Sequence, residues 1–130
     1  MHSVLVVDGH EIVRRGLIGL IAAEPDLEII GQAATSVDAT AQLARRHPAV
    51  AVLAARLPDG SGTALCRSLI SSTRAQRCLV FTGTDDEDMR SEAVRADAHG
   101  YLLKQRPGAE VIAAIRPLPT AELCRPDLRR

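Results

Sequence analysis

The chain of 130 residues has almost no aromatic side chains, no long apolar run and no excess of charge of either sign. Phe81 and Tyr101 are its only aromatic residues, which leaves little that could stack on the ring of a flavin. Sixteen basic residues balance sixteen acidic ones, and the arginines form scattered pairs, so the electrostatic footprint of a nucleic-acid-binding protein is missing. Charged residues interrupt every apolar run before it could span a bilayer. We therefore expect no direct contact with nucleic acid or with a membrane.

Cysteines are few and far apart in this sequence. Cys66, Cys78 and Cys124 form no CxxC motif and no cluster with histidine at metal-ligand spacing. Cys78 lies inside an apolar run and is expected in the core, whereas Cys124 is the thiol expected to be exposed. Residues 1–20 lack the apolar stretch and cleavage site of a signal peptide. These features predict a cytoplasmic protein with reduced thiols and no metal site.

Five short apolar segments alternate with segments of helical periodicity. The apolar segments are 3–7, 27–33, 50–54, 78–82 and 101–103. Strands that alternate with helices predict a parallel sheet covered by helices on both faces. The first, third and fourth segments are apolar at nearly every position, as central strands are, whereas 27–33 includes polar residues and suits an edge. The pattern predicts an α/β fold with a doubly wound, five-stranded parallel sheet in the flavodoxin-like order 2-1-3-4-5.

Helices are expected between these strands and after the last one. Pro25, a cap at Ser36 and Pro48 delimit the first two helices, and Ser61 precedes the third. The expected helices are 10–23, 36–47, 62–71, 85–96 and 107–116. Residues 117–130 contain three prolines and no sustained period, which predicts a loosely ordered end. We expect one domain, 1–116, followed by a short proline-rich tail without a DNA-binding domain.

Polar residues gather at the edge where a doubly wound sheet carries its functional groups. The residues expected there are Asp8, Gly9 and His10 after the first strand, Ala54, Thr82 and Lys104. The segments around them read VDGHEIVRRGL, RLPDGSG, FTG and GYLLK. In these motifs and in their order and spacing, residues 3–116 resemble the receiver domains of bacterial response regulators. The motifs look like those of the receivers usually fused to LuxR-type helix-turn-helix domains.

The resemblance implies a (βα)5 receiver fold and a role in two-component signalling. Receivers form an aspartyl phosphate at the end of the third strand, with Mg²⁺ held by acidic residues. Matched by position, Thr82 supplies the hydroxyl that bonds a phosphoryl oxygen and Lys104 supplies the cation. Tyr101 matches the switch aromatic, whose inward or outward rotation reports the conformational state of a receiver. Thr82 and Lys104 have a second interpretation, as inherited residues that only form hydrogen bonds at the rim.

The departures from the receiver pattern fall on the residues that carry the chemistry. Ala54 occupies the phosphoacceptor position, and Gly9 occupies the position of a second acid, so Asp8 is the only acidic metal ligand that remains. A methyl group cannot attack phosphorus, and Asp8 alone should hold Mg²⁺ poorly. We expect an atypical receiver that is not phosphorylated at the usual site. Losing two carboxylates should leave Lys104 and Asp8 as a lone ion pair that fixes the pocket in one state.

Two helices carry more apolar residues than a single core stripe needs, which indicates a protein partner or a second copy. These residues are Ile12, Val13, Leu17, Ile18, Leu20 and Ile21 in the first helix and Val111, Ile112 and Ile115 in the fifth. The contact surface is expected on the first helix or on the face formed by the fourth helix, fifth strand and fifth helix. The expected function is signal transduction or transcriptional control through such contacts, without a cofactor or enzymatic activity.

Three alternatives remain open at this point. Asp8 or Asp59 could be a working phosphoacceptor, although turn chemistry in the Leu-Pro-Asp-Gly segment explains Asp59. The chain could also be the N-terminal part of a transcription regulator without its DNA-reading domain. A flavodoxin-like cofactor binder shares the strand order, but the loop after the first strand lacks a phosphate cradle.

Overall fold

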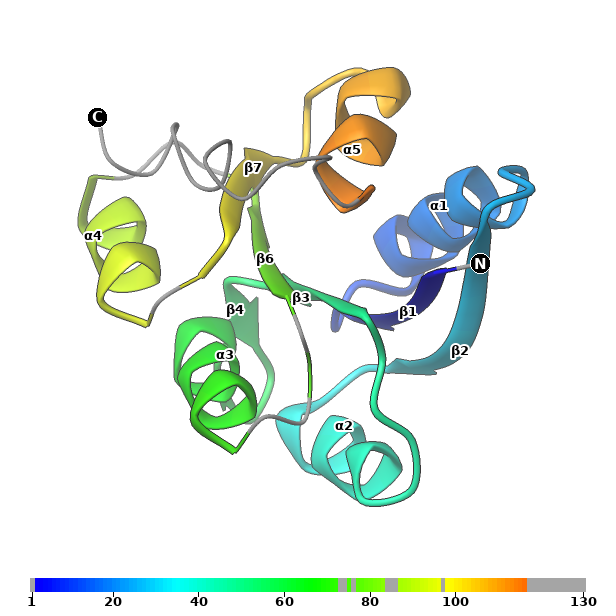
Figure 1. Ribbon diagram of the computed structural model, residues 1–130. Coiled ribbons are helices and arrows are strands. Elements are labelled where there is room, and N and C mark those ends of the chain that lie inside the picture. The colour runs from blue at the N-terminus through cyan, green and yellow to red at the C-terminus, as the bar shows by residue number, and fades with distance from the viewer. Residues whose placement is uncertain (1, 73–74, 76, 84–86, 97, 117–130) are drawn as a thin grey trace.

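The main sheet has five parallel strands in the order β2-β1-β3-β6-β7 (Figure 1). The computed structural model describes residues 2–72, 75, 77–83, 87–96 and 98–116. The strands are β1 (His2–Val7), β2 (Leu27–Ala33), β3 (Val50–Ala54), β6 (Arg77–Thr82) and β7 (Gly100–Leu103). This is the predicted order 2-1-3-4-5, counted over the five strands of the main sheet. Each strand begins and ends within one residue of its expected segment.

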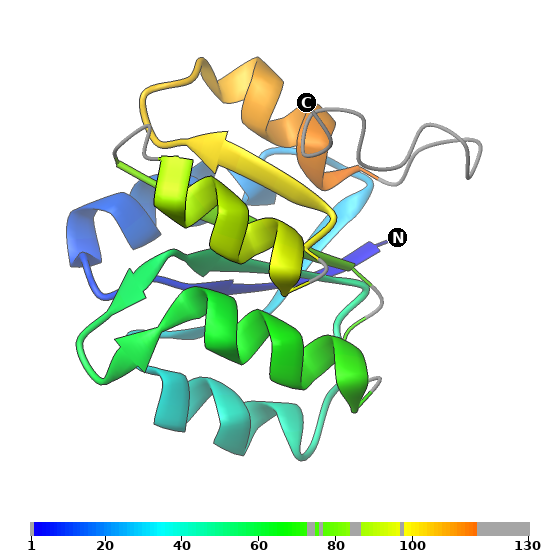
Figure 2. The same cartoon turned by 90° about the vertical axis from the view of Figure 1, so that its left-hand side faces the viewer.

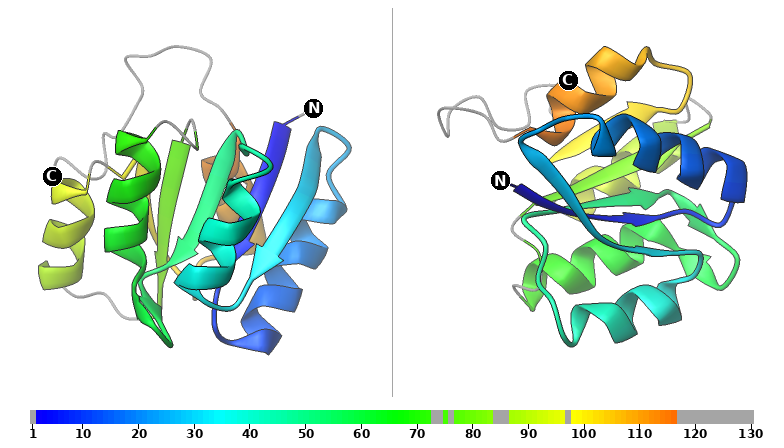
Figure 3. Two further views of the ribbon diagram at one scale, coloured as in Figure 1. Left: turned by 90° about the horizontal axis from the view of Figure 1, so that it is seen from below. Right: turned by 90° about the vertical axis from the view of Figure 1, so that its right-hand side faces the viewer.

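Helices in the described part of the chain cover both faces of the sheet, as Figures 2 and 3 show. They are α1 (Glu11–Ala22), α2 (Ser36–Leu43), α3 (Gly62–Ser71), α4 (Glu87–Arg95) and α5 (Gly108–Ile115). The helices α1 and α5 lie on one face, and α2, α3 and α4 lie on the other. Within the described ranges, no helix has both the length and the apolar character needed to cross a membrane.

The core consists of two layers, one on each face of the sheet. In β1, Val4 and Val6 pack with α1 and α5, while Leu5 and Val7 pack with the helices of the other face. All five residues of β3 are buried. Burying a Val or Leu side chain fully contributes roughly 1.5–3 kcal/mol. Because both faces of the central strands are covered, the buried positions of β1, β3 and β6 are apolar except for Thr82.

The second helix is shorter than expected, and its cap is a different residue. Thr35, and not Ser36, is the N-cap, since its hydroxyl accepts a hydrogen bond from the backbone N–H of Asp38 at 3.1 Å. The helix ends at Leu43 because residues 45–47 are exposed and polar and have no apolar side chain to bury against the sheet.

The other helices agree with the prediction where they are described. The helix α3 coincides with the expected range 62–71, and α1 and α5 are one residue shorter at each end. The helix α4 falls inside the expected range 85–96. Residues 85 and 86 at its expected beginning, and the expected tail 117–130 with Cys124, lie outside the described residues.

The end of α5 is tied to the loop that follows α1. The guanidinium of Arg116 contacts both carboxylate oxygens of Asp26, at 2.8 and 3.0 Å, and the carboxylate of Glu24. The hydrogen bonds from Arg116 lower the pKa of Asp26 to about 2. Two helices far apart in the sequence are therefore joined at the edge of the domain.

A short hairpin that the sequence did not predict follows β3. Its strands β4 (Arg56–Leu57) and β5 (Gly60–Ser61) pair antiparallel. Gly60 has a φ of +155°, a backbone conformation that residues other than glycine rarely adopt. Ser61 then caps α3, as expected, by accepting hydrogen bonds from two backbone N–H groups of the first turn.

Candidate functional site

Asp8 provides a buried carboxylate at the carboxyl end of β1. Its side chain is 2 % exposed, and its Oδ1 accepts a hydrogen bond from the backbone N–H of His10 at 2.9 Å. Arg14 donates from Nη1 to the backbone oxygen of Asp8 at 2.8 Å. His10 itself is the N-cap of α1, with a ring that is 78 % exposed. The chain around Asp8 thus supplies donors for a charge that would be costly to bury alone.

Lys104 supplies the positive charge opposite Asp8. Its Nζ lies 2.9 Å from Oδ2 of Asp8 and 6.0 Å from the centroid of the Phe81 ring. Among the described residues, Oδ2 of Asp8 has no further polar partner, so its charge is balanced by this ion pair without a regular hydrogen bond. The backbone N–H of Lys104 donates to the carbonyl of Thr82 at 2.7 Å. The predicted pairing of Asp8 with Lys104 is confirmed.

Ala54 and Thr82 end the neighbouring strands β3 and β6. Ala54 pairs in register with Phe81, so it lies beside the residue that precedes Thr82. Its methyl group is 2 % exposed and packs in the core. The first residue of α3, Gly62, packs closely against Ala54. A Cβ on Gly62 would lie only 1.8 Å from the carbonyl oxygen of Ala54. The side chain at the end of β3 therefore offers no polar atom for chemistry.

An open pocket of about 300 Å³ lies at these strand ends. It is lined by His10, Val13, Ala55, Arg56, Phe81, Thr82, Gly83 and Lys104. Thr82 and Lys104 reach this pocket, whereas Asp8 and Ala54 are buried and do not line it. Arg56 and Phe81 also line the pocket, although their sequence positions did not predict it. Their places next to the ends of β3 and β6 are the signal that could have identified them.

The arrangement does not fit Mg²⁺. This ion prefers about six oxygen ligands in octahedral geometry. Asp8 is the only one of the predicted site residues that carries a carboxylate, and its two oxygens already face Lys104 and the N–H of His10. Within the described ranges, no group of three or more His, Cys, Asp or Glu residues is placed to hold a metal ion.

Gly9 links this site to the hairpin. A Cβ at this position would lie 2.8 and 2.9 Å from Cδ and Cγ of Pro58, inside van der Waals contact. The proline ring is rigid, so any side chain at position 9 must displace the hairpin or the loop after β1. A second acid cannot be added there without a local rearrangement.

The carboxylate of Asp59 binds the neighbouring helix. Its two oxygens accept hydrogen bonds from the backbone N–H groups of Ser36 at 2.9 Å and Val37 at 3.0 Å, in the first turn of α2. These two bonds hold the pKa of Asp59 below its ordinary value of 3.8. Turn chemistry alone is thus an incomplete account of Asp59, because the residue also satisfies two N–H groups that a helix leaves without partners.

Tyr101 in β7 is turned into the core. Its side chain is 8 % exposed, and the Cζ atom of Arg90 in α4 lies 4.8 Å from the centroid of its ring. A guanidinium at this distance forms a favourable cation–π contact with the ring. The aromatic ring is therefore held inward against α4.

The two helices expected to carry surplus apolar surface differ. In α1 the expectation is confirmed, since Ile12 is 87 % exposed and Leu20 is 43 % exposed. In α5 it is wrong, because all three residues named in the prediction are buried against the sheet: Val111, Ile112 and Ile115. The short α5 turns its apolar side chains into a single core stripe.

Comparison with known proteins gives one consistent result. The family of the response regulator receiver domain matches residues 4–116. The DNA-binding transcriptional activator DevR/DosR of Mycobacterium tuberculosis is 41% identical over 116 residues, which cover 89% of this chain and 54% of that protein. The transcriptional regulatory protein LiaR of Bacillus subtilis is 30% identical over 116 residues, which cover 89% of this chain and 55% of that protein. The chain spans about half the length of these curated relatives.

A solved structure agrees with the sequence relatives. The two-component response regulator of the LuxR family from Aurantimonas sp. SI85-9A1 superposes with a TM-score of 0.81 at 29% identity. The superposition covers 88% of this chain and 82% of that one.

Proposed function

Because the chain belongs to the family of response regulator receiver domains, we propose that it is an atypical receiver, not phosphorylated at the usual site, that signals through protein contacts. The family match and the relatives make it a receiver related to LuxR-type regulators and not an enzyme. The proposed difference from other receivers is that Ala54 in place of the acceptor aspartate prevents a response to a phosphodonor at the usual site.

The observation that carries the proposal is Ala54 at the end of β3, beside an ion pair that already engages Lys104. An acceptor must offer a lone pair to phosphorus, and a methyl group has none. In a receiver, the lysine pairs with the phosphoryl anion. In this chain Lys104 lies 2.9 Å from Asp8, so its charge is already balanced without phosphate.

The position of Tyr101 supports a state that is set without phosphate. In the receiver pattern, this aromatic rotates between an inward and an outward orientation. Here its ring is 8 % exposed and lies against Arg90. The inward orientation supports the idea that the pocket and the switch residue are held in one state by the sequence itself.

We place the contact surface on α1 or on the face of α4, β7 and α5. Receiver domains typically dimerise through the face that corresponds to α4, β7 and α5 in this chain. Exposed Ile12 and Leu20 on α1 supply a second apolar surface. The relatives named above are transcription regulators, so the proposed output is control of transcription through a second copy or a separate regulator, without direct DNA contact.

The competing function, phosphotransfer to Asp8 or Asp59, has less support. Asp8 is buried and paired with Lys104, and both oxygens of Asp59 accept hydrogen bonds from α2. These contacts draw negative charge from the oxygen atoms, so either carboxylate would attack phosphorus less readily than one without them.

The experiment is incubation with Mg²⁺ and acetyl phosphate, followed by intact-mass spectrometry. We expect no change in mass for the native chain or for Ala54→Asn, a variant with a larger polar side chain but no carboxylate. A receiver with an intact acceptor aspartate, treated in parallel, is the positive control that the acetyl phosphate is active. A stable gain of one phosphoryl group by the native chain would contradict the proposal, and mapping it would distinguish Asp8 from Asp59.

A further inference from the structure

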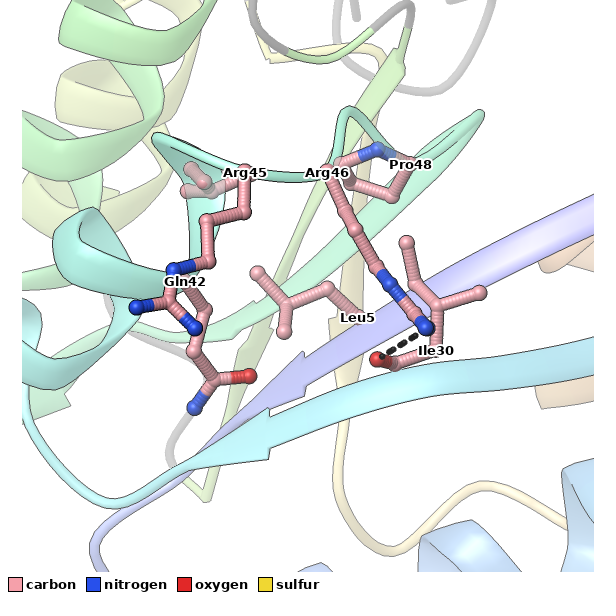
Figure 4. A pocket seen from close by; sticks show the side chains of 7 residues that line it. Leu5, Ile30, Gln42, Arg45, Arg46 and Pro48 are labelled. Carbon is pink, nitrogen blue, oxygen red and sulfur yellow. Dashed lines mark hydrogen bonds between the residues drawn. The ribbon is translucent and has the colours of Figure 1, made fainter.

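A second pocket, of about 160 Å³, lies between the edge strand β2 and the end of α2 (Figure 4). Its apolar lining comes from Leu5, Ile30, Leu43 and Pro48. The described lining residues of this pocket and of the pocket at Lys104 do not overlap. It is therefore a separate feature of the fold, and nothing proposed above depends on it.

An irregularity in β2 shapes this pocket. Val4 of β1 pairs with Ile29, but Leu5 pairs with Gly31, so Ile30 has no partner residue on β1. Such a bulge changes the direction in which a strand presents its side chains, and bulges are frequent next to binding sites. Ile30 forms one wall of the pocket, and its backbone oxygen accepts a hydrogen bond from Nη1 of Arg46 at 3.3 Å.

Gly31 makes the neighbouring wall possible. A Cβ at this position would lie 2.3 Å from Oε1 of Gln42, so a larger residue here would make the Gln42 side chain move away from the strand. Gln42 is held there because its Nε2 donates to the backbone oxygen of Gln32 at 2.6 Å. The wall is thus built from contacts on both α2 and β2.

Two arginines give the pocket a positive rim. Figure 4 shows Arg45 and Arg46 extending on either side of the Leu5 side chain. Arg46 is oriented by its bond to Ile30, while Arg45 forms no side-chain hydrogen bond or ion pair with the described residues. No acidic residue is part of the described lining. The planar guanidinium of Arg45 is therefore available for a bidentate bond to a carboxylate.

We propose that this pocket binds a small carboxylate that carries a compact aromatic or branched apolar group. A volume of about 150 Å³ holds a benzene-sized molecule, and this pocket has 160 Å³. The apolar group fills the space above Leu5 and Leu43, and the carboxylate lies at Arg45. Such a ligand gives the chain a chemical input that requires no phosphoryl group.

Benzoate is the probe for this proposal, titrated into the ¹⁵N-labelled full chain and followed by amide chemical shifts. We expect saturable shifts centred on Ile30, Gly31 and the segment 42–46, with a Kd on the order of 1 mM for so small a ligand. Acetate tests the charge without the ring, and benzyl alcohol tests the ring without the charge. Both should bind at least about fivefold more weakly, because each retains only one of the two interactions.

Arg45→Gln is the decisive variant, and Arg15→Gln is its matched control. Both changes remove one exposed arginine, but Arg15 lies on α1, where it pairs with Glu11. We expect Arg45→Gln to weaken benzoate at least about fivefold and to leave benzyl alcohol unchanged, while Arg15→Gln changes neither. Equal shifts with acetate, an equal benzoate affinity in Arg45→Gln, or no saturable shifts at these residues would each overturn the proposal.

Discussion

Two aspartates near the carboxyl edge of the sheet are held in opposite ways. Asp8 is buried, and its carboxylate contacts the ammonium of Lys104, the backbone N–H of His10 and, at 3.5 Å, Nδ1 of the His10 ring. Asp59 is exposed, and its two oxygens accept hydrogen bonds from the first turn of α2. Both carboxylates contribute to the structure, but water can replace the partners of only one of them.

The difference indicates where this domain is vulnerable. A buried carboxylate that loses its cation remains in a medium of low polarity, whereas an exposed one is solvated at once. Gly9 and Pro58 connect the two regions, because each is adjacent in sequence to one of the aspartates and a Cβ at position 9 would collide with the Pro58 ring. Changes at Lys104, at Gly9 and at Asp59 should therefore destabilise the domain in decreasing order.

The largest loss is expected for Lys104→Ala. Removing the partner of a buried carboxylate costs on the order of 3–5 kcal/mol. The Lys104 side chain is 18 % exposed, so we expect a loss at the lower end of this range. Urea unfolding at neutral pH measures the free energy. The double variant Asp8→Asn with Lys104→Met is the control, since it removes both charges and should recover much of the loss. If Lys104→Ala has the same free energy of unfolding as the native chain, the ion pair does not stabilise the folded domain.

An intermediate loss is expected for Gly9→Ala, and the same clash of the Cβ atom with Pro58 applies to Gly9→Asp. Overpacking against a rigid ring typically costs about 1–3 kcal/mol. Pro58→Ala removes the atoms that the new Cβ meets, so Gly9→Ala should cost less in that background. Thermal unfolding of the four proteins in this cycle gives the coupling. If the two losses of stability simply add, the collision with Pro58 is not the reason why Gly9→Ala destabilises the domain.

The smallest loss is expected for Asp59→Ala, which leaves two N–H groups of α2 to water. Because the pKa of Asp59 is lowered in the folded state, its contribution is complete above the ordinary value of 3.8 and is lost as the pH falls through the lowered value. The difference in unfolding temperature between the native chain and Asp59→Ala should therefore shrink in acid. Asp59→Asn keeps one acceptor and should lie between them. A difference that is independent of pH would exclude this role of the charge.

The regular elements could be predicted because they depend on local pattern. Uninterrupted apolar segments identified the central strands, and Ser61 identified the start of α3. The pairing of Asp8 with Lys104 followed from the receiver pattern with two of its carboxylates missing, together with the rule that functional groups meet at the carboxyl ends of parallel strands. The apolar residues of α5 were misjudged because a sequence gives the number of apolar side chains on a helix but not how deeply it packs.

The contacts between loops could not be predicted in the same way. The bonds from α2 to Asp59 join residues 22 and 23 positions apart, and no local pattern specifies that the hairpin approaches this helix. The same holds for the pocket at Ile30, which depends on a register shift of one residue in the pairing of β1 with β2.

The sequence by itself determined the parallel sheet and the absence of a nucleophile at Ala54, because side-chain chemistry and apolar periodicity are properties of the chain. Only the tertiary structure decided which charges meet, which apolar residues stay exposed and where the second pocket lies. Those features depend on distances between segments remote in the sequence, and packing fixes these distances only when the whole core has formed.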